Sequence, residues 1–244
     1  MPANDRAALA GGAGVERTPA EPGRIGRIVL AIRRHGLPRA VYDLALKTIN
    51  TVVVFKILRG VVIERADPEF LVCPPRYTPL FLDAKMLGHF AADPGSGMTA
   101  AFVEEALSKG DECYGFLEDG RLVAYGWYAS SPTRIDPPDL RVRFSDDYVY
   151  MYKGFTHPRA RGQRLHAIGM TLALREYLAR GRRGLVSYVE SSNFDSLRSC
   201  RRMGYETFGS VYLMKVFGRY VTFASPGCRR LGFRLETAPR PGVS

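Results

Sequence analysis

The chain has 244 residues, of which 46% are hydrophobic and 24% charged, as in ordinary globular proteins of one or two domains. Its formal net charge of +11 favours polyanionic partners such as phosphates or nucleotides, although a solvated basic surface would also account for it. No run of about 18 apolar residues and no signal-peptide pattern occurs, so we expect neither a transmembrane helix nor secretion.

The spacing of cysteine and histidine gives no reason to expect a metal site. None of the four cysteines belongs to a CxxC pair, and the four histidines form no HExxH or similar arrangement of ligands. Scattered thiols in a chain of this size are typical of the reducing cytoplasm, where disulfides are rare. The sequence therefore predicts a cytoplasmic protein that binds no metal.

The N-terminal quarter of the chain differs in composition from the rest. Residues 1–23 are rich in Ala, Gly, Pro and Glu, and we expect a disordered N-terminal arm because they offer little apolar surface to bury. Residues 24–60 form a basic helical segment, which Gly36 and Pro38 divide into two helices. We expect the pair to pack on the main domain; the alternative is peripheral contact with an anionic membrane.

One domain is predicted for residues 61–225, with a C-terminal tail at 226–244. The first half of the domain mixes strand-like runs with helical patterns. The strands are residues 61–65, 112–117 and 122–128, and the helices are residues 79–91 and 99–108. Residues 131–145 contain three prolines and several charges, so we expect a functional loop there.

The second half alternates strands and helices. The strands are residues 147–156 and 185–190, the helices are residues 162–180 and 193–203, and residues 205–216 and 220–224 form a closing strand pair. Strand-helix-strand units of this kind form parallel pairs through a right-handed crossover. The sequence therefore predicts an α/β fold: a mixed, mostly antiparallel sheet flanked by helices, with a central βαβ crossover.

The turn between strand 147–156 and its helix has the features of an anion site. The first turn of a helix carries free backbone N–H groups and a partial positive charge, and Gly162 lets a ligand approach the backbone closely. Three arginines add positive charge: Arg159, Arg161 and Arg164. These features suit a pyrophosphate, although an ordinary βα turn with solvated arginines would explain them as well.

Two motifs in this half resemble those of the GNAT superfamily of N-acetyltransferases. The first is T-H-P-R-A-R-G-Q-R-L-H, from Thr156 to His166, in which Pro158, Arg161 and Gly162 match the family's loop V-x-P-x-x-R-G-x-G-x-G/A. The second runs from Asn193 to Tyr205, where an Asn opens a helix and a Gly-aromatic pair ends it. Both occur in order and in their expected βα context, which makes the resemblance much more specific than either motif alone.

The resemblance implies that an acyl-CoA, most simply acetyl-CoA, is the co-substrate. Backbone groups of Phe155 and Thr156 would hold the pantetheine arm, and Asn193 would hydrogen-bond the same region unless it serves only as an N-cap. The CoA pyrophosphate would lie on backbone N–H groups of the loop, from Arg161, Gly162, Gln163, Arg164, Leu165 and His166. Two of these depart from the pattern, because Arg164 and His166 stand where the family has Gly and Gly or Ala.

Catalytic residues are less evident from the sequence. Many family members have a Tyr that protonates the departing thiolate, and here that position is Cys200, which also suits a small buried residue. Strand 147–156 carries no carboxylate beyond its first residue, so Glu190 at the end of the next strand is a candidate general base. Tyr152 is a candidate for positioning a water molecule.

The resemblance implies direct acyl transfer, most simply of acetyl, from acyl-CoA to a primary amine of a small molecule or aminosugar, in a ternary complex. One alternative is a longer acyl donor, as acyl-CoA or on an acyl carrier protein. Another is a non-catalytic module that binds CoA or a membrane. We expect no nucleic acid partner, because no aromatic-basic motif occurs. Residues 131–145 and the helices between 79 and 108 are expected to line the acceptor site.

Overall fold

The computed structural model describes residues 24–51, 53–135 and 140–237 of the chain, and the predicted arm at residues 1–23 lies outside them. The chain divides after Tyr42 into two units. Among the described residues, no helix is long and apolar enough to cross a membrane.

The first unit contains the first helix predicted from the basic segment and the beginning of the second, which continues past Tyr42 into the second unit. Helix α1 (Arg24–His35) ends at Gly36, whose φ of 84° stops the helix, and α2 (Leu37–Ile49) begins with Pro38 in its first turn. This is the usual use of glycine after a helix and proline at the start of one. Val29 and Leu30 on α1 and Val41 on α2 are exposed. Packing of the pair on the main domain, or on a membrane, stays a prediction.

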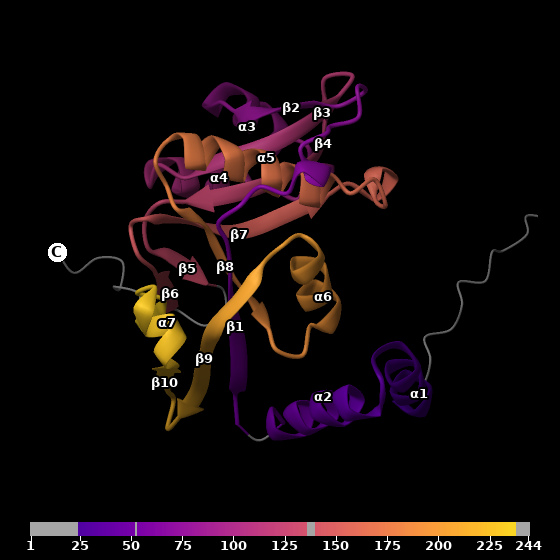
Figure 1. Cartoon of the computed structure of the whole chain (residues 1–244), viewed down its shortest axis with the longest axis vertical. Helices are drawn as coiled ribbons and strands as arrows, with labels where there is room; N and C mark the ends of the chain where they lie inside the picture. The colour runs from indigo at the N-terminus through magenta and orange to yellow at the C-terminus, as the bar shows by residue number, and fades with distance from the viewer. Residues whose placement is uncertain (1–23, 52, 136–139, 238–244) are drawn as a thin grey trace, which may run out of the picture. The chain divides into compact units, whose positions relative to one another are not determined.

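The second unit is built on an eight-stranded sheet with the order β10-β9-β1-β8-β7-β4-β3-β2 (Figure 1). Its strands are β1 (Phe55–Ile63), β2 (Thr78–Leu82), β3 (Glu112–Glu118), β4 (Arg121–Ala129), β7 (Tyr148–Thr156), β8 (Gly184–Glu190), β9 (Glu206–Val216) and β10 (Arg219–Ala224). Every neighbouring pair is antiparallel except β7 and β8, which are parallel and joined by helix α5 (Leu165–Ala179). The predicted fold class is confirmed.

A second, three-stranded sheet has the order β11-β6-β5, and here the structure differs from the sequence prediction. Residues 131–145 contain β5 (Thr133–Ile135) and β6 (Leu140–Arg143), not only a loop. Residues 226–244 include helix α7 (Pro226–Arg230) and β11 (Arg234–Thr237). Phe233, between them, is completely buried against the main sheet's core. These strands have only three or four residues, so their alternation of buried and exposed residues is too short to stand out in the sequence.

Two further boundaries also differ. Strand β1 begins at Phe55, so the predicted division at residues 60 and 61 falls inside a strand. The helix predicted at 79–91 is in fact β2 followed by a short helix, α3 (Ala84–Ala91), which Asp83 caps by accepting from Met86 N–H. β2 is an edge strand, where Pro79 is tolerated because no neighbour needs its missing N–H.

The two faces of the main sheet are covered differently, and this arrangement positions the site. Helix α5 lies across one face and buries residues all around its axis, including Leu165, Leu172 and Leu174. The other face is covered by α3 and α4 (Ala100–Ser108) over β3 and β4, and by the small sheet over β1, β7, β8 and β9. The middle of the second face, between α4 and the small sheet, is left open.

Candidate active site

Strands β7 and β8 pair at their beginnings and then separate. Their parallel ladder has only three pairs, from Tyr148 opposite Gly184 to Tyr150 opposite Val186. At its end the Ser187 hydroxyl donates to Met151 O at 2.8 Å. Beyond this point β7 continues beside β4, β8 continues beside β1, and Figure 1 shows the two strands running apart. The gap leaves one edge of β7 without a strand partner.

The backbone groups that face this gap can be identified from the neighbouring ladder. His157 N–H donates to Val123 O at 2.8 Å, so this residue faces β4. Since the groups of successive residues in an antiparallel strand alternate in direction, Thr156 and Gly154 face the gap. The backbone of Phe155 faces β4, and its ring stacks on Tyr125 at 5.4 Å. Gly154, rather than Phe155, therefore shares with Thr156 the geometry expected of a pantetheine-binding edge.

The loop after β7 presents the free N–H groups of a helix start. A 3-10 turn, η3 (Pro158–Ala160), leads into Arg161–Arg164 and then into α5. The first hydrogen bond of α5 runs from Ile168 N–H to Arg164 O. The N–H groups of Leu165, His166 and the next residue consequently have no acceptor within the helix. Together with the helix dipole they form an anion site at the end of the splayed strand.

The loop's backbone explains part of the motif and one departure from it. Gly162 has a φ of 78° and Arg164 a φ of 59°, both in the left-handed region that favours glycine. An arginine there costs about 1–2 kcal/mol. Its guanidinium donates to Glu69 at 2.7 Å and lies 4.7 Å from the centre of the Phe70 ring. Arg161, Gly162 and Gln163 are exposed, whereas the Leu165 side chain is buried in the core.

His166 brings the start of α5 against the splayed part of β7. Its ring lies over Gly154, where a Cβ atom would come within 2.9 Å of His166 Cε1. His166 is exposed as a whole, but desolvation of its ring lowers its pKa. Gly154 thus allows the start of α5 to lie close to β7, and it also belongs to the free edge of that strand.

Replacing Gly154 with Ala should raise the Kd for CoA about 10-fold, because the new methyl group pushes His166 and the anion loop away from the strand edge. Isothermal titration calorimetry measures this. Gly115→Ala is the matched control, since its Cβ would come equally close, at 2.8 Å, to the side chain of Leu82 on another part of the sheet. Equal losses of CoA affinity in both variants would contradict the assignment.

The next helix, α6 (Phe194–Arg202), holds two predicted site residues. Asn193 caps it, with Oδ1 accepting from Ser196 N–H at 3.1 Å, so the side-chain oxygen is already used. Cys200 is half-buried and packs against the core cluster that includes Met203 and Tyr205. Burial raises the pKa of the Cys200 thiol, so this side chain stays protonated.

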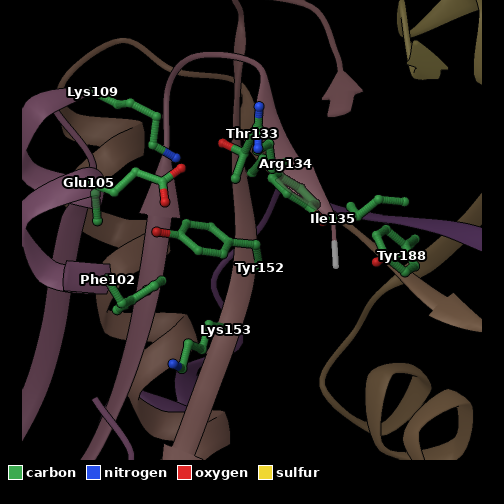
Figure 2. Close-up of a pocket in the computed structure, with 11 residues that line it drawn as sticks. Phe102, Glu105, Lys109, Thr133, Arg134, Ile135, Tyr152, Lys153 and Tyr188 are labelled. Carbon is green, nitrogen blue, oxygen red and sulfur yellow. The ribbon is translucent and has the colours of Figure 1, made fainter. Parts of the chain in front are cut away.

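A cavity of about 630 Å³ lies on the sheet face opposite α5, where β7 and β8 separate. Its walls come from α4, β5, β7 and β8 (Figure 2). Of the segments expected to line an acceptor site, α4 and residues 133–135 line this cavity, whereas α3 contributes no residue to it. The lining residues are Phe102, Glu105, Ala106, Lys109, Thr133, Arg134, Ile135, Tyr150, Tyr152, Lys153 and Tyr188. The tyrosines form a row across the separating strands, with ring centres 5.9 Å (Tyr150–Tyr152) and 6.4 Å (Tyr150–Tyr188) apart.

A bulge in β7 gives this cavity two consecutive residues. Trp127 on β4 lies opposite Lys153, and Tyr128 lies opposite Met151, so Tyr152 is the extra residue. Successive residues of a regular strand point to opposite faces, and a bulge changes this alternation locally. Both Tyr152 and Lys153 therefore line the cavity.

Tyr152 connects the cavity to a buried carboxylate. Its hydroxyl donates to Asp111 Oδ2 at 2.9 Å, and Lys109 Nζ lies 3.0 Å from the same oxygen. The Asp111 side chain is fully buried, and its Oδ1 atom has no hydrogen-bond partner among the described residues. Burial raises the pKa of Asp111, while Lys109 and Tyr152 oppose that shift. Burial and the Asp111 carboxylate raise the pKa of Tyr152, so it remains a neutral donor.

Glu190, by contrast, lies outside this cavity. Its carboxylate accepts from Lys56 Nζ at 2.7 Å, and both side chains are substantially exposed. The structure thus brings Tyr152 to the cavity and leaves Glu190 and Cys200 out of its lining. The residues missed by sequence reasoning are Glu105, Lys109, Asp111 and Lys153. The first two could have been found with Phe102 and Ala106, because all four share one face at helical spacing.

No protein-family model matches the chain, and no curated protein matches it in sequence. Similar solved structures include a putative GNAT-family acetyltransferase from Novosphingobium aromaticivorans, 18% identical, covering 66% of this chain and 64% of that one, with a TM-score of 0.44. A GCN5-related N-acetyltransferase-like protein from Streptococcus suis is 16% identical, covering 75% of this chain and 68% of that one, with a TM-score of 0.46.

An aminoglycoside N-acetyltransferase in complex with CoA is 17% identical, covering 53% of this chain and 91% of that one, with a TM-score of 0.41. The chain spans less than two thirds of the length of the Novosphingobium structure. At identities of 16–18% and TM-scores of 0.41–0.46, these likenesses assign no activity to the chain.

Proposed function

We propose that this protein is an acyl-CoA-dependent N-acyltransferase, acting on the primary amine of a small molecule by direct transfer in a ternary complex. The observation that carries the proposal is the gap between β7 and β8. On one side of the sheet the gap meets the N-terminus of α5, and on the other it opens at the cavity of about 630 Å³. One binding path therefore connects a site for a pyrophosphate with a site for an acceptor.

The donor is held mainly by backbone groups. The free edge of β7 at Gly154 and Thr156 pairs with the amides of the pantetheine arm as a neighbouring strand would. The N–H groups at the start of α5 bind the pyrophosphate, and the exposed guanidinium of Arg161 adds positive charge. Asn193 retains its side-chain NH₂ group for the pantetheine, since only its oxygen caps α6.

The acceptor nitrogen attacks the thioester carbonyl, so a C–N bond forms and the C–S bond breaks. The amine must lose a proton in this step, and the sulfur of CoA must gain one. Tyr152 gives its own hydroxyl proton to Asp111 along the 2.9 Å hydrogen bond, while its oxygen accepts a proton from the amine. Glu105, on the cavity wall, stabilises the incoming ammonium form by its charge. The departing CoA thiolate takes a proton from water, and Asp111 returns its proton to solvent through Tyr152 after the products leave, so protons balance over the cycle.

Calorimetry with purified full-length protein tests the donor site, and mass spectrometry with a panel of donors and amines tests the chemistry. We expect saturable binding of CoA and acetyl-CoA, and a mass gain of the amine equal to the acyl group. Absence of CoA binding would refute the proposal. Binding without any amide product would leave only a CoA-binding module, and products confined to long-chain donors would favour a longer acyl substrate.

A further inference from the structure

Two charged side chains that line the cavity, Glu105 and Lys153, are of opposite sign. Lys109 is neutralised by Asp111. In the part of the chain that the structure describes, neither Glu105 nor Lys153 forms an ion pair, although both line the cavity. In the view of Figure 2 the Tyr152 ring lies between these two side chains. A ligand with two opposite charges would satisfy both.

Lys153 loses part of its hydration by facing the cavity. The bulge at Tyr152 turns it toward the cavity, where its Nζ lies 4.0 Å from the centre of the Phe102 ring. Partial burial lowers the pKa of Lys153. A cation–π contact compensates an ammonium only in part for lost water, and a hydrogen-bonded anion compensates it to a greater extent. The position is therefore suited to an anionic group brought by a ligand.

The other residues that line the cavity indicate the chemical character of the rest of the ligand. Phe102, Tyr150, Tyr152 and Tyr188 supply aromatic surface, and Ile135 supplies an aliphatic side chain. Aromatic and aliphatic walls with a few charged groups are typical of sites for small molecules of mixed character. A polyamine or a polycationic aminosugar would instead bring positive charge next to Lys153.

We propose that the acceptor is a zwitterionic amine with an aromatic or apolar body, whose carboxylate or phosphate binds Lys153 and whose amino group lies at Glu105 and Tyr152. This inference rests on the proposed function. It makes Lys153 a determinant of specificity that selects acid-bearing amines from their uncharged counterparts.

Matched pairs of acceptors test the proposal. Phenylalanine is compared with phenethylamine, tyrosine with tyramine, and tyramine O-phosphate with tyramine, with release of CoA as the readout for kcat/KM. We expect the acid-bearing member of at least one pair to be preferred about 10-fold, as a charge-assisted hydrogen bond provides. The first two pairs report on a carboxylate and the third on a phosphate.

Lys153→Met should bring this preference close to unity by raising KM for the acid-bearing acceptor. Lys215→Met is the matched control, because Lys215 also stands over an aromatic ring, at 5.3 Å from that of Tyr220, but on the β9–β10 hairpin. The control should keep the preference. A preference for the uncharged amines, or one that survives in Lys153→Met, would overturn the proposal.

Binding of the same acceptors to the protein saturated with CoA, measured by calorimetry, separates this inference from the proposed function. Acid-bearing amines that bind the wild type and not Lys153→Met support the zwitterion site even without turnover. Amide formation from uncharged amines alone supports the transferase and refutes the zwitterion site. Absence of both CoA binding and turnover refutes the transferase.

Discussion

Asp111→Asn should lower kcat by about 100-fold, the usual contribution of a positioned proton acceptor. Asparagine has nearly the same shape and can still accept the hydrogen bond from Tyr152, but it cannot take the proton that leaves the amine. Initial rates of CoA release, measured at saturating acetyl-CoA and amine, provide the value of kcat. Tyr152 lines the cavity and Asp111 acts through it, so KM for the amine should change much less than kcat.

The pH dependence distinguishes this role from a structural one. Only the carboxylate form of Asp111 accepts a proton, so kcat of the wild type should rise as pH increases through the pKa of Asp111. Because burial raises that pKa, the rise should lie above the ordinary range of an aspartate. In Asp111→Asn this rise of kcat with pH should be absent. A lower kcat with an unchanged pH profile would show that Asp111 only supports the fold.

Glu112→Gln is the control for a change in charge at the adjacent residue. Glu112 is partly exposed and accepts two hydrogen bonds from Arg180 Nη1, at 2.9 and 3.0 Å. Exposed pairs of this kind contribute about 0–1 kcal/mol to stability, so the variant should retain nearly all of its activity. A comparable loss in both variants would point to a general electrostatic effect.

Gly184→Ala should destabilise the protein by about 3 kcal/mol, at the upper end of the usual cost of overpacking. Gly184 lies at the start of β8, opposite Tyr148, where β1 passes closest. A Cβ atom would come within 2.3 Å of Ile63 O and 3.1 Å of Glu64 Cα. Both are backbone atoms, so the strands themselves must move apart. Chemical denaturation, followed by circular dichroism, measures the change in unfolding free energy.

Gly88→Ala is the matched substitution in a helix. Gly88 lies within α3, is exposed, and would have no atom within 4 Å of an added Cβ. This variant should gain about 1 kcal/mol, because alanine favours the helix over glycine. If Gly184→Ala left the free energy of unfolding unchanged, β1 and β8 would have to lie farther apart than they do in the structure.

The central crossover is the part of the fold that could be predicted best. The strand at 147–156, its helix and the strand at 185–190 appear within three residues of their predicted ends, since long periodic segments carry strong local signals. The N-cap at Asn193 is also local, because the side chain bonds a backbone group three residues away. The small sheet was not predictable, because β6 and β11 pair across about 90 residues and each has four residues.

The sequence by itself determined the order of strands and helices in the crossover, the glycine and arginine of the loop before α5, and the resemblance on which the donor assignment was based. These features depend on residues that are neighbours in the chain. Only the tertiary structure decided which side chains meet at the acceptor cavity. Tyr152 and Asp111 are 41 residues apart, and Lys153 faces the cavity only because of a bulge set by its pairing with β4. Burial and charge at those positions come from non-local packing, which no local pattern encodes.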